Sequence, residues 1–127
     1  MSRYELSIET HFSAAHQLRG YPGDCARLHG HNWHVKLFVE CRELDELGMG
    51  IDYKIMKQEV KAAIDKWDHY NLNDIEPFNQ INPTSENVAR LLCKEMQQRL
   101  DNDRIKVSRV EIAETCTAKV IYWPDPS

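Results

Sequence analysis

Two long stretches of alternating side chains in the first third of the chain constrain its fold most strongly. The even positions of residues 4–16 and the odd positions of residues 31–41 are mostly apolar, and polar side chains fill most positions between them. This period of two predicts β-strands with one buried face. A loop rich in turn-forming residues, from Gly20 to Asp24, lies between them. We therefore expect an antiparallel pair of strands joined by a long loop.

Two amphipathic helices are expected after these strands. Apolar residues recur every three or four positions from Tyr53 to Trp67, after a suitable N-cap at Asp52, and again over residues 88–100. Residues 82–86 combine a capping side chain, a proline in the first turn and an early acid, and they predict the start of the second helix.

Two further strands are expected at residues 105–114 and 119–123, which gives the element order ββααββ. The order predicts an α+β fold with a four-stranded antiparallel sheet and both helices on one face. Such a sheet has open edges and one uncovered face. Association of several chains through their strand edges would protect them.

Composition and charge restrict the class of protein. The 127 residues suffice for one domain, residues 1–127, with a hydrophobic core. With 16 basic and 20 acidic residues the net charge is −4, which argues against nucleic acid as a partner. There is no apolar run of about 18 residues to predict a membrane span, and the first residues have no apolar signal core, so a cytoplasmic location is expected. We expect the four cysteines, at positions 25, 41, 93 and 116, to be free thiols.

Three histidines near the predicted hairpin suggest a metal site. His29 and His31 are two residues apart in an extended segment, so both rings project from the same side, and His16 on the neighbouring strand can complete a set of three nitrogens. Three nitrogens leave the fourth position of a tetrahedral Zn²⁺ open for water or substrate. Gly30 is expected to permit a close backbone approach. Each histidine alone would more often be an ordinary polar residue.

Other metal sites fit the sequence less well. A cupin-type site would need a glutamate three or four residues after the histidine pair, where this chain has residues 34–36 with none. A structural zinc site would need a second cysteine near Cys25. Cys25 itself is either a bystander thiol or, beside a cation and Arg27, a thiolate that serves as a general base.

Two acidic segments complete the set of candidate residues. Asp68 and His69 follow the first predicted helix. As a lone dipeptide they are weak evidence for a catalytic pair, because a histidine that complements the helix dipole and a solvated acid would look the same. Glu114 has the parity of the apolar face of its strand, where a carboxylate is costly unless it is paired. It would accept from the N–H groups of a heterocycle or form a salt bridge to lysine or arginine.

Together and in this order, these segments resemble the 6-pyruvoyl-tetrahydropterin synthase superfamily. The likeness runs nearly end to end and rests on residues 12–16, 25–32, 68–69, 82–86 and 114–115. The gap of three residues between Cys25 and His29 is similar to that of the queuosine-pathway branch, 6-carboxy-5,6,7,8-tetrahydropterin synthase. The animal pyruvoyl branch typically has a longer spacing.

The resemblance implies a fold and a reaction. The fold would be the tunnelling fold, in which subunits join their sheets into a β-barrel as a trimer and two trimers stack into a homohexamer. The reaction would convert 7,8-dihydroneopterin triphosphate to 6-carboxy-5,6,7,8-tetrahydropterin with loss of acetaldehyde and triphosphate. The active site would lie between subunits. Pyruvoyl-tetrahydropterin synthesis from the same substrate and a non-catalytic pterin- or metal-binding module are the alternatives.

The resemblance also implies roles for individual residues. The metal would be zinc, bound by the three histidines named above. Cys25 would transfer protons as a base, and Asp68 would orient His69 in the other half of a relay, which requires the helix to unwind after Trp67.

For the substrate, the resemblance implies that Glu114 anchors the pterin ring. Thr115 and the Thr84–Ser85 segment would assist it. Arg27 is a candidate contact for the triphosphate.

Overall fold

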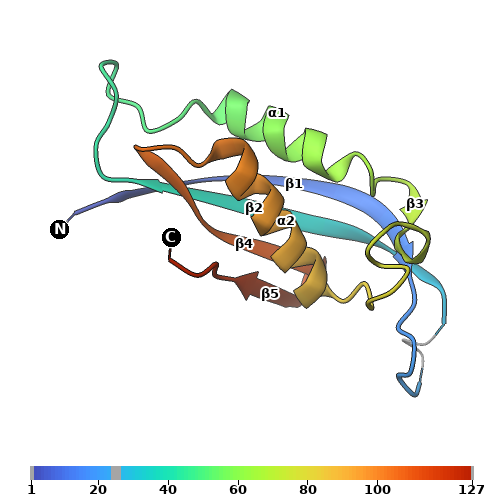
Figure 1. Ribbon diagram of the computed structural model, residues 1–127. Helices are drawn as coiled ribbons and strands as arrows, with labels where there is room; N and C mark the ends of the chain where they lie inside the picture. Colours follow the sequence, from blue (N-terminus) through green and yellow to red (C-terminus); the bar gives the residue numbers. More distant parts are fainter. Residues whose placement is uncertain (1, 24–26, 127) are drawn as a thin grey trace.

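The computed structural model describes residues 2–23 and 27–126 (Figure 1). Within these residues, a mixed sheet packs under two helices. The elements in chain order are β1 (Tyr4–His16), β2 (His29–Cys41), α1 (Tyr53–Ile64), β3 (Tyr70–Asn71), a short 3-10 helix (Leu72–Asp74), α2 (Ser85–Leu100), β4 (Ile105–Thr115) and β5 (Ala118–Tyr122).

The predicted antiparallel pair is confirmed and is the longest feature of the sheet. β1 and β2 pair without interruption from Tyr4 opposite Cys41 to His16 opposite His29. β4 pairs antiparallel with β2 on its other side, with a shift of register between Phe38 and Val39, and β5 pairs antiparallel with β4. The strand order is β3-β1-β2-β4-β5.

The prediction of four strands is wrong by one. β3 pairs parallel with the end of β1, where Tyr70 lies opposite Ala14 and Asn71 opposite Ala15. A strand of two residues shows no alternation in the sequence, so periodicity cannot reveal it. Tertiary hydrogen bonds hold it in place, because the Asp68 carboxylate accepts from the Ser13 amide just before β3 begins.

Capping side chains set where both helices begin. The Asp52 carboxylate accepts from the Lys54 amide at 2.8 Å, and the Thr84 hydroxyl accepts from the Asn87 amide at 3.1 Å. Each such cap contributes about 1 kcal/mol. Thr84 is thus the N-cap, and Pro83 precedes the helix instead of lying in its first turn.

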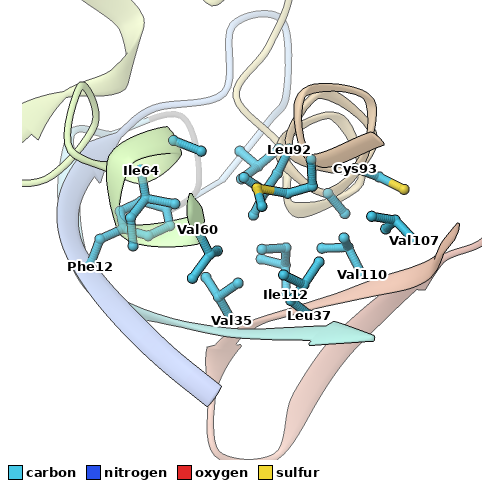
Figure 2. Close-up of a cluster of buried hydrophobic side chains, with 14 of the residues drawn as sticks. Phe12, Val35, Leu37, Val60, Ile64, Leu92, Cys93, Val107, Val110 and Ile112 are labelled. Carbon is cyan, nitrogen blue, oxygen red and sulfur yellow. The ribbon is translucent and has the colours of Figure 1, made fainter. Parts of the chain in front are cut away.

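The core lies between the sheet and the helices. Figure 2 shows Phe12, Val35 and Leu37 of the sheet facing Val60 of α1 and Leu92 of α2. These five side chains are at most 1% exposed. Both helices therefore cover the same face, as the sequence predicted. None of the helices in the described residues is long and apolar enough to cross a membrane.

The other face of the sheet carries charged and polar side chains. Lys36 lies 3.2 Å from Glu9 and 3.8 Å from Glu111, and Glu111 lies 3.5 Å from Lys119. These ion pairs run across four strands, because Glu9 is on β1 and Lys119 is on β5. We call this side the uncovered face.

Candidate metal centre and active site

Three histidines meet at the end of the β1–β2 pair, on the face that the helices cover. His16 is the register partner of His29, and His31 lies opposite Ala14. The ring centroids are 4.6 to 5.2 Å apart. One ring nitrogen from each histidine lies within 4.8 Å of the others, so the group could hold a metal ion. The alternation that predicted the strands therefore also brings these three rings together.

Hydrogen bonds determine which ring nitrogen is free on two of the histidines. His16 Nδ1 lies 2.7 Å from the Pro83 carbonyl oxygen, and His29 Nδ1 lies 2.7 Å from the Arg27 carbonyl oxygen. A carbonyl can only accept, so both Nδ1 atoms donate and both Nε2 atoms present a lone pair. These two Nε2 atoms are 3.1 Å apart. Two lone pairs at this distance repel unless a cation lies between them, so the donor set fits a metal ion.

Burial favours the neutral form in which a histidine binds metal. His16 is 1% exposed, and its ring packs against Trp33 with the centroids 4.8 Å apart. Loss of hydration lowers the pKa of His16 and also that of His31. The Nε2 atom of His31 is buried and has no hydrogen-bond partner among the described residues. A buried nitrogen with no hydrogen-bond partner fits the third ligand of a metal ion.

Glu114 lies beside the triad near the end of β4. Its Oε2 atom is 3.5 Å from His31 Nε2, and its side chain is 28% exposed. Among the described residues this histidine is its only ionic partner, so the alternative of a salt bridge to lysine or arginine is not realised there. The carboxylate thus has room to accept from a ligand next to the metal position. Thr115 is exposed, with its hydroxyl 3.4 Å from that of Thr117 in the turn to β5.

The helix ends before His69 as expected, but earlier than predicted, because turns already follow Ile64 whereas the expected helix reached Trp67. α1 ends at Ile64, and His69 has φ 67°, in the left-handed region. Asp68 Oδ1 accepts from the Ser13 amide at 2.9 Å and lies 3.1 Å from His69 Nδ1. The Ser13 hydrogen bond is the main reason that the pKa of Asp68 lies below its usual value. A carboxylate held in this way can orient the imidazole beside it.

The ring of His69 is not one of those that meet in the triad of the described residues. Its side chain is 81% exposed, at a hollow of 520 Å³ whose lining includes Ser13, Ala15 and Asn32, and also the triad residue His31. Since side chains alternate along a strand, the first three of these project toward the uncovered face, whereas His16 projects toward the helices. A single chain therefore brings Glu114 to its triad but does not bring His69 to it.

The glycine between two of the histidines has a different setting from the one expected. A Cβ atom added at Gly30 would meet nothing within 4 Å, so the expected close backbone approach is wrong within this chain. Gly30 lines the same hollow as His69.

The remaining candidate residues lie around the site. Thr84 uses its hydroxyl to cap α2, and the Ser85 hydroxyl lies 3.2 Å from Glu86. The side chain of Arg27 is exposed. Cys25 lies outside the described residues. The other three cysteines, at positions 41, 93 and 116, are free thiols, as predicted.

Sequence reasoning missed the contribution of Pro83. Its carbonyl oxygen fixes the ring of His16 from 67 residues away. The helix-start signal around it was visible, but a main-chain carbonyl has no signature in a sequence, so only the fold reveals this contact.

The fold and the site define the class of protein: an α+β chain that gathers three histidines and a carboxylate at one end of a sheet. Residues 5–125 match the model of the family described as 6-pyruvoyl tetrahydropterin synthase. The chain belongs to this family.

The chain is similar to proteins named 6-carboxy-5,6,7,8-tetrahydropterin synthase and to one named 6-pyruvoyl tetrahydropterin synthase. The chain is 35% identical over 128 residues to the 6-carboxy-5,6,7,8-tetrahydropterin synthase of Bacillus subtilis, covering 95% of this chain and 86% of that protein. It is 32% identical to the enzyme of that name from Synechocystis, covering 91% and 89%. A solved structure of Caenorhabditis elegans 6-pyruvoyl tetrahydropterin synthase superimposes with a TM-score of 0.86 at 29% identity, covering 98% of both chains.

Proposed function

We propose that this protein is a zinc-dependent carbon–oxygen lyase. It converts 7,8-dihydroneopterin triphosphate and water to 6-carboxy-5,6,7,8-tetrahydropterin, acetaldehyde and triphosphate, as a step of queuosine synthesis. The observation that carries the proposal is the placement of Glu114 3.5 Å from the third nitrogen of a histidine triad. A carboxylate at this position would be an acceptor for a heterocycle next to a bound metal. The names of the relatives from Bacillus subtilis and Synechocystis agree with it.

The triad would hold the metal through His16, His29 and His31. When bound, zinc would act as a Lewis acid and template that orients the side-chain hydroxyls of the substrate and lowers their pKa. In the neutral rings, the hydrogen bonds to the Pro83 and Arg27 carbonyls hold the proton on Nδ1 and leave Nε2 free to bind the metal.

Glu114 would accept hydrogen bonds from the N–H groups of the pterin ring. This fixes the distance between the ring and the metal position. Thr115, Thr84 and Ser85 would border the ring, and Arg27 would contact the triphosphate through its exposed guanidinium.

Proton transfer would be divided between two chains. Cys25 is four residues before His29 in the sequence and would serve as one base. Asp68 and His69 open on the uncovered face and so would serve the triad of a neighbouring subunit. This need for two chains is what supports an assembly with sites between subunits, which we propose to be a homohexamer made of two trimeric barrels.

Product analysis tests the proposal directly. Purified zinc-loaded protein is incubated with 7,8-dihydroneopterin triphosphate, the pterin is identified by mass, and acetaldehyde is measured with a coupled alcohol dehydrogenase. We expect the carboxy product and one acetaldehyde per turnover. The variant Cys25→Ala should lose about 10²–10⁴-fold in turnover, as expected for loss of a general base. Full activity in Cys25→Ala would refute the role of the base.

A second function shares the same site. The likeness to the Caenorhabditis elegans synthase favours 6-pyruvoyl-tetrahydropterin as the alternative product. That reaction retains all three side-chain carbons and releases no acetaldehyde, so the same assay distinguishes the two. A protein that binds zinc and pterin without turnover would instead be a binding module.

A further inference from the structure

A second pair of histidines lies outside the site described above. His11 on β1 and His34 on β2 are register partners, and both are exposed. Their ring centroids are 6.2 Å apart and the ring planes are tilted by 48°. Both project toward the uncovered face, because they alternate with the buried Phe12 and Trp33. The proposed reaction uses neither of them.

The spacing of these two rings is close to that of metal-binding histidines. Two imidazoles that bind one tetrahedral zinc through nitrogens about 2.0–2.1 Å from the ion have ring centres about 5 Å apart. The centroids within the triad, at 4.6 to 5.2 Å, have this spacing. His11 and His34 are about 1 Å wider, and small side-chain rotations at two exposed positions can close that difference.

The surroundings of the pair provide space and a further donor. A hollow of 210 Å³ is lined by both histidines together with Glu9, Lys36 and Glu111. Glu9 lies two residues before His11 on the same face, and its side chain is 72% exposed. Its present partner is Lys36, at 3.2 Å. An exposed ion pair of this kind is worth at most about 1 kcal/mol, so the carboxylate can exchange partners at little cost.

We propose that His11 and His34 form a second binding site for a divalent transition-metal ion, on the uncovered face and separate from the triad. The ion is of the class that prefers imidazole nitrogen, such as Zn²⁺ or Cu²⁺. Two imidazoles supply two ligands. Water and the Glu9 carboxylate complete the coordination, and the affinity is lower than at the triad because only two of the donors are fixed by strand pairing.

Counting bound zinc in matched variants tests the second site. The assembled protein, freed of any affinity tag, is dialysed against excess Zn²⁺ at pH about 7.5, where histidine is neutral. Zinc per chain is then measured by atomic emission. We expect two ions per chain in the parent protein, and one in His11→Ala and in His34→Ala. The variant His29→Ala should also hold one, which it keeps at the second site.

The matched control is His69→Ala, which removes an exposed histidine that has no histidine opposite it. It should still bind two ions. One ion per chain in the parent protein, or two in His11→Ala, would overturn the proposal. As a readout that does not depend on stoichiometry, Cu²⁺ added to the zinc-loaded protein should broaden the ring-proton NMR signals of His11 and His34 before that of His69. The result is independent of turnover, so it stands apart from the proposed reaction.

Discussion

Mixing two inactive variants should restore activity if the active site is shared between chains. The variant His29→Ala removes one proposed metal ligand and keeps the proposed Asp68–His69 relay, and His69→Ala removes the proposed relay and keeps the triad. His29 belongs to the triad at the covered face, whereas His69 is exposed beside Ser13, Ala15 and Asn32 of the uncovered face. Each variant alone should therefore be nearly inactive, while a mixed assembly contains some sites with both intact parts.

The expected magnitude follows from counting combinations. In assemblies formed at random from equal amounts, half of the triads are intact and half of the neighbouring relays are intact, so about one quarter of the sites are complete. Coexpressing the two variants with different tags and purifying through both tags yields assemblies that contain both chains. Turnover per site, measured by acetaldehyde release, should approach about one quarter of the parent value.

A site contained within one chain gives a different result. Each chain would then carry its own defect, and mixing would restore nothing beyond the sum of the two variants. That outcome would refute the argument from the two faces of the sheet. A double variant that carries both substitutions, coexpressed with itself, provides the background value.

Three further predictions concern stability and binding. Lowering the pH from about 7.5 to about 5 should lower the urea midpoint of the metal-free protein. Burial lowers the pKa of His16 in the folded chain. The unfolded chain, with a histidine pKa of about 6.5, therefore takes up the proton first, and acid favours unfolding. A midpoint that rises on acidification would contradict this. Gly50→Ala should lower the free energy of unfolding, measured in urea, by about 1–3 kcal/mol, because the new Cβ would lie 2.8 Å from the Cys41 sulfur. Adding Cys41→Ala to this variant should restore part of the loss. Equal stability of Gly50→Ala and the parent protein would refute the contact. Glu114→Gln should weaken pterin binding by about 1.5–3 kcal/mol, which raises KM about tenfold to a hundredfold. The zinc content should not change. A loss of zinc would instead show that Glu114 supports the metal.

The parts of the fold that follow from periodicity could be predicted. β1 and β2 each alternate over 13 residues, long enough for the pattern to specify both the strands and their buried face. The caps at Asp52 and Thr84 lie next to clear helical patterns. The strand β3 could not be found, because two residues carry no period and their position depends on hydrogen bonds made by Ser13.

Some residues of the candidate site could likewise be predicted from the sequence, and others could not. His16, His29 and His31 could be predicted because strand alternation converts sequence spacing directly into side-chain direction. The placement of His69 could not, since its left-handed backbone and its side of the sheet depend on how the chain leaves α1. The setting of Gly30 was misjudged because a glycine in a sequence does not say which neighbour it accommodates.

Main-chain carbonyls hold two histidines of the triad, and this has a consequence for how the site tolerates change. The oxygen atoms that hold His16 and His29 belong to Pro83 and Arg27, so substituting either side chain leaves the acceptor in place. Point mutation is thus a weak way to disturb these imidazoles. Insertions and deletions are a strong one, because a loop one residue longer before α2 would carry the carbonyl away from the ring. Along this lineage, we expect loop length at these two places to vary less than residue identity.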